Sequence, residues 1–236
     1  MDNPNLITPQ VSLQTSRKYL AWKKNIEHAG CQLESMEPMQ ICSKPNGSLL
    51  FAFLKTRVLD PEGRPLPAYA LLRGHACVIV TVMENLETGG KKFLMVRQRR
   101  IGHGAESLEF PAGMLDENTE DAKGVAIREL EEETGLKINS DSIVPLSDQA
   151  LYSSPGLDDE AIHYFLCQIK LSPEEMSKYE SGEKGLADEH EYIQIGLWNY
   201  ADAWNAATSL QVRFGFLLYQ DYLRSTNSNS VQTQSK

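Results

Sequence analysis

The chain has 236 residues, of which 41% are hydrophobic, so it is long enough to bury a sizeable core. Its formal net charge of −9 and pI of about 5.1 argue against tight electrostatic binding of nucleic acid, because an acidic surface repels polyanions. The sequence contains no uninterrupted apolar run long enough to cross a bilayer, so we expect no membrane partner.

Both ends of the chain are polar. Residues 1–15 lack the charged-then-apolar pattern of a secretory signal, and we expect them to be disordered in a cytoplasmic protein. Residues 225–236 are rich in Ser, Asn and Gln and are also expected to be disordered. The four cysteines show no C-x-x-C spacing, which favours reduced thiols over a zinc site or a disulfide framework.

Residues 16–69 predict a small N-terminal module. A helix over residues 16–29 ends at Gly30 and is followed by a strand-like stretch from residue 32 onward. Apolar runs at 39–42 and 49–59 flank a Pro-Asn-Gly turn. Two or three strands are marginal alone in water, so we expect this module to pack against another domain or a second chain.

Residues 70–224 are expected to form the main domain. The strands are predicted at 76–83, 93–97, 143–152, 161–169 and 191–198, and the helices at 200–207 and 210–223. No internal repeat is apparent.

The most informative segment is the run R-E-L-E-E-E-T-G-L at 128–136, which predicts a helix ended by Gly135. At about 100° per residue, Glu129, Glu132 and Glu133 lie on one helical face. Crowded carboxylates repel one another unless a cation neutralises them, and Mg²⁺ prefers oxygen ligands of this kind. The ordinary alternative is a solvated acidic face, and the flanking residues decide against it.

Upstream of this helix lies the loop Glu109-Phe110-Pro111-Ala112-Gly113. Together the loop and the helix resemble the Nudix box, which reads Gly, five residues, Glu, seven residues, Arg-Glu-aliphatic-any-Glu-Glu-any-Gly-aliphatic. The match is complete over 128–136, whereas six residues separate Gly113 from Glu120 instead of five. The resemblance implies a Nudix α/β/α sandwich with a mixed sheet, here with an N-terminal β-rich extension.

Further segments resemble the ADP-ribose and ADP-sugar diphosphatase branch of the Nudix hydrolases. They are Arg73-Gly74-His75, the arginine cluster at 97–100, Ser154-Pro155-Gly156 and the loop at 185–191. The N-terminal module and the run Pro-Ala-Gly-Met-Leu-Asp at 111–116 are most similar to plant-type ADP-sugar diphosphatases. The Ala-Asp-Glu-x-Glu segment at 187–191 is more similar to bacterial ADP-ribose diphosphatases.

The resemblance implies a role for each matching residue. Mg²⁺, or Mn²⁺ in its place, would be bound by the carbonyl of Ala112 and by Glu129, Glu133 and Glu191. The catalytic set would comprise Glu189 as general base, Glu132 beside the metal, and Arg128, which can orient Glu132 by an i,i+4 pair. Since the two branches differ in this loop, the choice between Glu189 and Glu191 as base stays open. The positions that match substrate contacts are Arg73, Arg100, Met114, Ser154 and Glu160.

The expected reaction is Mg²⁺-dependent hydrolysis of the pyrophosphate bond of an ADP-sugar or ADP-ribose, which gives AMP and a sugar phosphate. A UDP-glucose or GDP-mannose diphosphatase is the alternative among enzymes, and a non-catalytic nucleotide-sugar sensor is the alternative outside them. An RNA-binding or decapping Nudix protein is disfavoured by the acidic composition. We also expect a homodimer in which residues 30–70 supply much of the interface.

Overall fold

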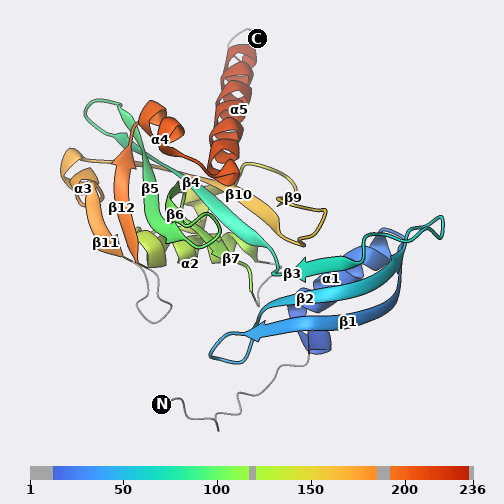
Figure 1. The fold of residues 1–236 in the computed structure, drawn as a ribbon. Coiled ribbons are helices and arrows are strands. Elements are labelled where there is room, and N and C mark those ends of the chain that lie inside the picture. Colours follow the sequence, from blue (N-terminus) through green and yellow to red (C-terminus); the bar gives the residue numbers. More distant parts are fainter. Residues whose placement is uncertain (1–12, 117–120, 185–191, 234–236) are drawn as a thin grey trace, which may run out of the picture. The chain divides into compact units, whose positions relative to one another are not determined.

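The computed structural model describes residues 13–116, 121–184 and 192–233 (Figure 1). The chain folds into two units. The first contains the N-terminal residues up to Ala76, together with residues 114–116 and 151–162. The second contains residues 77–113, 121–150 and the rest of the described chain from His163 onward. Each unit is thus built from more than one stretch of sequence. The predicted division into residues 16–69 and 70–224 stays a prediction.

The first unit begins with a short helix, η1 (Leu13–Thr15), and continues into α1 (Arg17–His28). The side chain of Ser16 caps α1 by accepting a hydrogen bond from the backbone N–H of Tyr19. The helix ends before Gly30, whose φ of 73° is accessible to glycine at little cost. The predicted helix at 16–29 is thus confirmed.

A three-stranded antiparallel sheet completes most of this unit, in the order β1 (Gln32–Ser43), β2 (Leu49–Leu59), β3 (Tyr69–Leu72). Alternate residues of β2 are buried, as expected for a sheet with one covered face. The core is small and joins strand residues to the N-terminal helices; its buried members are Leu13, Tyr19, Leu49, Ala52, Leu54 and Leu72. Residues 151–162 attach to this sheet through β3, where Leu71 N–H donates to the carbonyl of Leu157 at 2.8 Å.

The larger sheet has nine strands among the described residues. Its main path is β11 (Ser181–Lys184), β12 (Ile193–Trp198), β5 (Lys91–Arg100), β4 (Ala76–Asn85), β10 (Ala161–Leu171) and β8 (Ile143–Pro145). Three short strands pair with this path: β6 (Ala105–Glu109) with β5, β7 (Ala112–Met114) with β4, and β9 (Leu151–Tyr152) with β10. The first residue of β4, the last of β7, all of β9 and the first two of β10 belong to the first unit.

The second unit also contains α2 (Ala122–Thr134), η2 (Ser140–Ser142), α3 (Pro173–Ser177), α4 (Tyr200–Ala206) and α5 (Leu210–Thr233). An aromatic cluster joins α5 to the sheet, with the ring of Phe216 centred 4.9 Å from Phe93 and 4.8 Å from Phe110. Gly215 makes this approach possible, since a methyl group there would lie 3.1 Å from the Phe110 ring. The predicted mixed α/β architecture is confirmed. None of the helices in the described part of the chain has the length and apolar character needed to span a bilayer.

Several local predictions were wrong. Residues 143–152 form two short strands instead of one, and Leu13 is buried although residues 1–15 were expected to be disordered. Helix α5 continues to Thr233 through the expected C-terminal tail, which contains no Gly or Pro between residues 225 and 233 to stop it. The strands β3, β6, β7 and β11 and the helix α3 were not predicted.

Candidate active site

Helix α2 carries the acidic run, and its ends are well defined. Asp121 caps the N-terminus by accepting a 2.8 Å hydrogen bond from the backbone N–H of Gly124. Gly135 ends the helix with a left-handed φ of 74°. Val125, Ala126 and Leu130 are buried, so one face of the helix is fixed against the core of the second unit.

The same side of α2 brings two carboxylates to strand β7, since Glu129 and Glu133 follow the buried Val125 by four and eight residues. Glu133 is only 6% exposed, and its Oε2 accepts a 3.1 Å hydrogen bond from the backbone N–H of Ala112. Glu129 lies against the next residue, because a methyl group at Gly113 would fall 2.0 Å from Glu129 Cδ. The predicted metal-binding residues Ala112, Glu129 and Glu133 are therefore neighbours in the folded chain.

Cys77, the second residue of β4, also lies beside Gly113, Glu129 and Glu133. Its Sγ–H donates to the carbonyl of Gly113 at 3.6 Å, and its side chain is buried. The pKa of the Cys77 thiol is raised to about 12, chiefly by burial and also by the negative charges of Glu129 and Glu133, while the hydrogen bond with the Gly113 backbone acts in the opposite direction. Sequence reasoning treated this cysteine only as a reduced thiol.

The donor set of this region fits a hard divalent cation. Two carboxylates and a backbone carbonyl supply oxygen ligands, which Mg²⁺ prefers. Within the described residues, however, no three His, Cys, Asp or Glu side chains form a complete metal site by themselves. Among the described residues, an ion bound by Glu129 and Glu133 would take its further oxygen ligands from the backbone, from water or from the substrate. Glu120, Glu189 and Glu191 lie outside the described residues.

Glu132 and Arg128 differ from the other predicted residues of α2 because both are exposed. The ion pairs found among the described residues do not include the expected one between them. Helical periodicity placed Glu132 on the same broad face as Glu129 and Glu133, but only the latter two reach β7.

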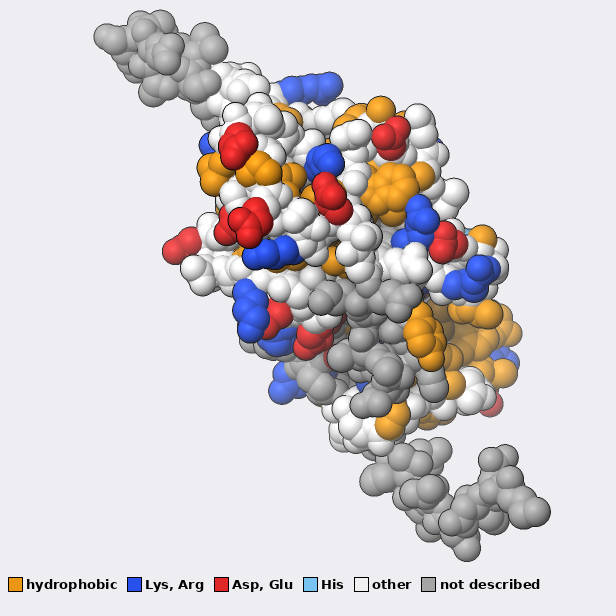
Figure 2. All heavy atoms as spheres, turned by 90° about the vertical axis from the view of Figure 1, so that its left-hand side faces the viewer, with side chains coloured by type: hydrophobic (Ala, Val, Ile, Leu, Met, Phe, Trp, Pro, Cys, Tyr) orange, Lys and Arg blue, Asp and Glu red, His pale blue; other side chains and the backbone are white. Residues whose placement is uncertain are grey.

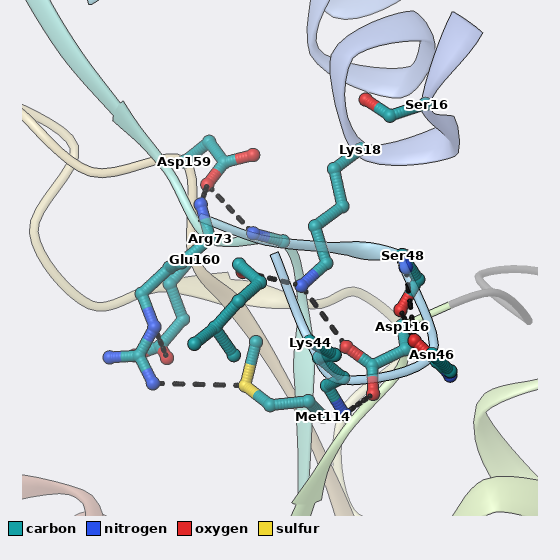
Figure 3. A network of polar contacts seen from close by, with 12 residues as sticks. Ser16, Lys18, Lys44, Asn46, Ser48, Arg73, Met114, Asp116, Asp159 and Glu160 are labelled. Carbon is teal, nitrogen blue, oxygen red and sulfur yellow. Dashed lines mark hydrogen bonds and ion pairs between the residues drawn. The ribbon is translucent and has the colours of Figure 1, made fainter. Parts of the chain in front are cut away.

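Three of the predicted substrate residues meet in the first unit (Figure 3). Arg73 Nε lies 3.2 Å from Oε2 of Glu160, and Arg73 Nη2 lies 3.7 Å from Sδ of Met114. Glu160 is 4% exposed, and its other oxygen accepts a 3.1 Å hydrogen bond from the hydroxyl of Ser153. The guanidinium is therefore held in place while its side chain remains nearly half exposed.

Asp159 supports this cluster, although sequence reasoning did not single it out. Its Oδ1 accepts hydrogen bonds from the backbone N–H groups of Arg73, at 2.8 Å, and Gly74, at 3.0 Å (Figure 3). Burial raises the pKa of the Asp159 carboxyl despite these bonds. For His75, burial acts against the charged imidazolium and lowers the pKa, although the negative charges of Asp159 and Glu160 act to raise it. The only sequence signal was the acidic run 158–160.

Arg100 and Ser154, the two other predicted substrate residues, have different surroundings. Arg100 belongs to the second unit and makes a two-pronged ion pair with Glu109, with an Nη2–Oε2 distance of 2.6 Å. Ser154 is exposed, and its carbonyl accepts from the N–H of Asp158 at 2.9 Å. The hydroxyl that reaches Glu160 is that of Ser153 and not of Ser154.

Comparison with known protein families covers the region of α2 and the Ala112–Gly113 backbone. The family model for the NUDIX domain matches residues 74–207, which is more than half of the chain. The chain belongs to the Nudix family. The matched Nudix region includes Ala112, Gly113, Glu129 and Glu133, and it confirms the resemblance found in the sequence.

Named relatives support this Nudix assignment. The chain is 31% identical to "Nudix hydrolase 14, chloroplastic" of Arabidopsis thaliana over 72% of its own length and 57% of that protein. It is 36% identical to the ADP-ribose pyrophosphatase of Bacillus subtilis over 51% of this chain and 58% of that protein. The ADP-sugar pyrophosphatase of Mus musculus is 32% identical over 47% of this chain and 51% of that protein. The matched region thus spans little more than half the length of these relatives.

A solved structure shares the Nudix fold. The crystal structure of an ADP compounds hydrolase matches with a TM-score of 0.55 over 83% of this chain and 97% of that chain, at 19% sequence identity. At this identity the match establishes the fold and leaves the substrate to be argued from the site.

Proposed function

We propose that this Nudix protein hydrolyses the pyrophosphate bond of an ADP-sugar or ADP-ribose and releases AMP and a sugar phosphate. The observation that carries the proposal is the convergence of Glu129 and Glu133 on the Ala112–Gly113 backbone. The names of the Bacillus and mouse relatives support ADP-ribose and ADP-sugars as substrates.

Divalent cations are general cofactors of Nudix hydrolases, and we propose Mg²⁺ here, with Mn²⁺ as a substitute. The ion would be held by the Ala112 carbonyl, Glu129 and Glu133, with Glu191 as a further ligand. When bound, it would neutralise the phosphoryl oxygens and lower the pKa of water. The hydrogen bond from Ala112 N–H to Glu133 keeps that carboxylate at β7, which pre-orders one ligand.

In the proposed reaction the side chains of the protein accept a proton and support the metal ion. We propose that Glu189 accepts a proton from the attacking water, whose oxygen bonds to phosphorus as the bridging P–O bond breaks. The leaving phosphate then carries the bridging oxygen. A positioned general base contributes about 10²–10⁴ in rate. Glu132, exposed on α2, would act on the metal through water, and Arg128 would lie beside it without substrate contact.

The substrate would be bound by Arg73, Met114 and Glu160, which already contact one another. An arginine held by a buried carboxylate keeps its remaining N–H donors oriented for a phosphate or a ribose hydroxyl. Arg100 could bind phosphate only by giving up part of its pairing with Glu109. Ser154 would offer its hydroxyl to the substrate, since the residue is exposed and its carbonyl already accepts hydrogen bonds in the local turn.

A panel of nucleotides with product identification tests the proposal. ADP-ribose, ADP-glucose, UDP-glucose, GDP-mannose and capped RNA would each be incubated with Mg²⁺, with Mn²⁺ and after chelation. We expect AMP plus sugar phosphate from an ADP compound, and no turnover without metal. Preferred hydrolysis of UDP-glucose or GDP-mannose would replace the ADP assignment, and tight binding of all substrates without turnover would establish a sensor. On the face shown in Figure 2, Lys and Arg side chains are interspersed with Asp and Glu, which does not favour RNA.

We further propose a two-fold homodimer in which residues 30–70 supply much of the interface. Strand β1 is an edge strand with no buried residue, and such edges are usually covered. Phe53 and Tyr69 stack at 5.7 Å on this sheet, with Tyr69 and Met39 exposed. Light scattering of the full chain and of a chain lacking residues 1–70 tests this. A soluble, monomeric and fully active truncated chain would refute it. Cytoplasmic location likewise remains a prediction from the sequence.

A further inference from the structure

Lys18 is a buried lysine that the proposed reaction does not use. It lies in the first turn of α1, and its side chain is 4% exposed. A lysine is almost never fully buried unless its ammonium group is paired, because desolvation of the charge is costly. The partners of Lys18 therefore indicate why the charge is kept.

The ammonium group of Lys18 joins three segments of the first unit (Figure 3). It lies 3.0 Å from Asp116 Oδ1 and donates a 2.9 Å hydrogen bond to the carbonyl of Leu50 in β2. The second oxygen of Asp116 lies 2.6 Å from Nζ of Lys44. Asp116 is thus held between two lysines, one from α1 and one from the turn between β1 and β2.

The first route from Lys18 to the substrate cluster runs through Gly74. Three carbons of the Lys18 stem would lie 3.1 Å from a methyl group at Gly74, so the two residues are in close contact. Gly74 has a φ of 83°, and its N–H is bound by Asp159, which also binds the N–H of Arg73. The stem of Lys18 therefore packs against the turn that orients Arg73.

The second route runs along the chain from Asp116 to Met114. Between them, Leu115 N–H donates to the carbonyl of His75 at 2.9 Å. Met114 in turn lies 3.7 Å from Arg73 Nη2. Both sets of contacts end at Arg73. Without the ammonium group of Lys18, we expect the turn at Gly74 and the segment from Met114 to Asp116 to be held less firmly.

We propose that Lys18 is a positioning residue that fixes Arg73 and Met114 for substrate binding. The inference rests on the proposed function, since it takes Arg73 and Met114 as substrate contacts. The partners of Lys18 in the described part of the chain are Asp116, Leu50 and Gly74, and none of these three is expected to bind metal. Its loss should therefore weaken substrate binding while the metal requirement stays unchanged.

Kinetics of Lys18→Met separate this role from simple stabilisation. Methionine keeps the length of the stem against Gly74 and removes the charge, while Lys44 still neutralises Asp116. We expect the KM for the ADP substrate to rise about tenfold with kcat changed less than about threefold, as for lost uniform binding. The Mg²⁺ concentration for half-maximal rate should not change. Lys18→Arg, which restores a cation, should recover part of the KM.

Lys23→Met is the matched control, because Lys23 lies on the same helix, is 44% exposed and pairs at 3.7 Å with the exposed Glu27. It should leave the KM unchanged. A KM for Lys18→Met equal to that of the control, with both proteins folded by circular dichroism, would overturn the proposal. A fall in kcat as large as the rise in KM, together with a higher Mg²⁺ concentration for half-maximal rate, would also overturn the proposal, because such changes indicate a general structural defect.

A second measurement does not depend on turnover. In protein labelled with ¹³C-methyl methionine, the Met114 signal is assigned with Met114→Leu. Lys18→Met should shift or broaden that signal, whereas Lys23→Met should not; the added methionine is recognised by its absence from the wild type. An unmoved Met114 signal refutes the positioning role even if no nucleotide in the panel is hydrolysed. A shifted signal in a chain without turnover leaves the coupling intact and rejects only the proposed function.

Discussion

Gly113→Ala should disable the metal site without unfolding the protein. A methyl group at this position would lie 2.0 Å from Cδ and 2.3 Å from Cγ and Oε1 of Glu129. An ordinary carbon–carbon contact needs about 3.5 Å, so the carboxyl group must move by roughly 1.5 Å. A good metal site keeps its metal–ligand distances within about 0.2 Å of the ideal values. A Glu129 carboxylate displaced by the methyl group would therefore no longer be a good ligand.

The size of the effect follows from that displacement. A misplacement of about 1 Å in an active site can cost about 10²-fold in rate, which corresponds to about 2.7 kcal/mol of transition-state stabilisation. We expect the activity of Gly113→Ala to fall by about this factor, with a higher Mg²⁺ requirement. The melting temperature should change little, because the half-buried Glu129 side chain can turn away from the methyl group.

The assay is a Mg²⁺ titration of initial rates, supported by calorimetric titration of Mn²⁺ into the free protein. Gly102→Ala is the control, because a methyl group at Gly102 would meet no atom within 4 Å. Wild-type rates and an unchanged Mg²⁺ requirement in Gly113→Ala would refute the assignment of Glu129 as a metal ligand.

The other predictions concern the acids of the site and the buried thiol. Glu133→Gln should lower the rate by orders of magnitude with the fold retained, because the amide keeps the shape and loses the charge; near-normal turnover with Mg²⁺ would contradict the metal role. Glu189→Gln should lower chiefly kcat, and Glu191→Gln should weaken metal affinity; the reverse pattern in rates and Mn²⁺ titrations would exchange the two roles. Because the pKa of Cys77 is raised to about 12 in the folded protein from an ordinary value of 9.0, burial of the neutral thiol stabilises the fold fully below pH 9. That contribution is lost as pH rises towards 12, so Cys77→Ala should flatten this part of the alkaline unfolding profile; an unchanged profile would argue against the raised pKa.

Part of the site could be predicted because its signals are local in sequence. Glu129 and Glu133 are four residues apart on one helix, and helical geometry alone places them on the same face. The motif around them also identified the loop at Ala112–Gly113 as their partner. Sequence periodicity could not separate Glu132 from the other two, since the difference depends on which side of α2 meets β7.

The remaining features depend on contacts between residues far apart in the chain. Arg73 meets Glu160 and Asp159 across more than 80 residues, and no local pattern records that pairing. Lys18 was assigned to a helix correctly, but its burial depends on Asp116, which β7 and the following residues bring to it. The pairing of Arg100 with Glu109 likewise comes from the neighbouring strands β5 and β6.

The sequence by itself determined the Nudix family, the acidic helix, and most of the longer helices and strands, because these follow from periodicity, capping residues and a dense local motif. Only the tertiary structure decided which side chains are partnered. It also decided that the N-terminal unit includes residues 114–116 and 151–162, because short strands such as β3 and β7 are stabilised by their neighbours and not by their own propensities.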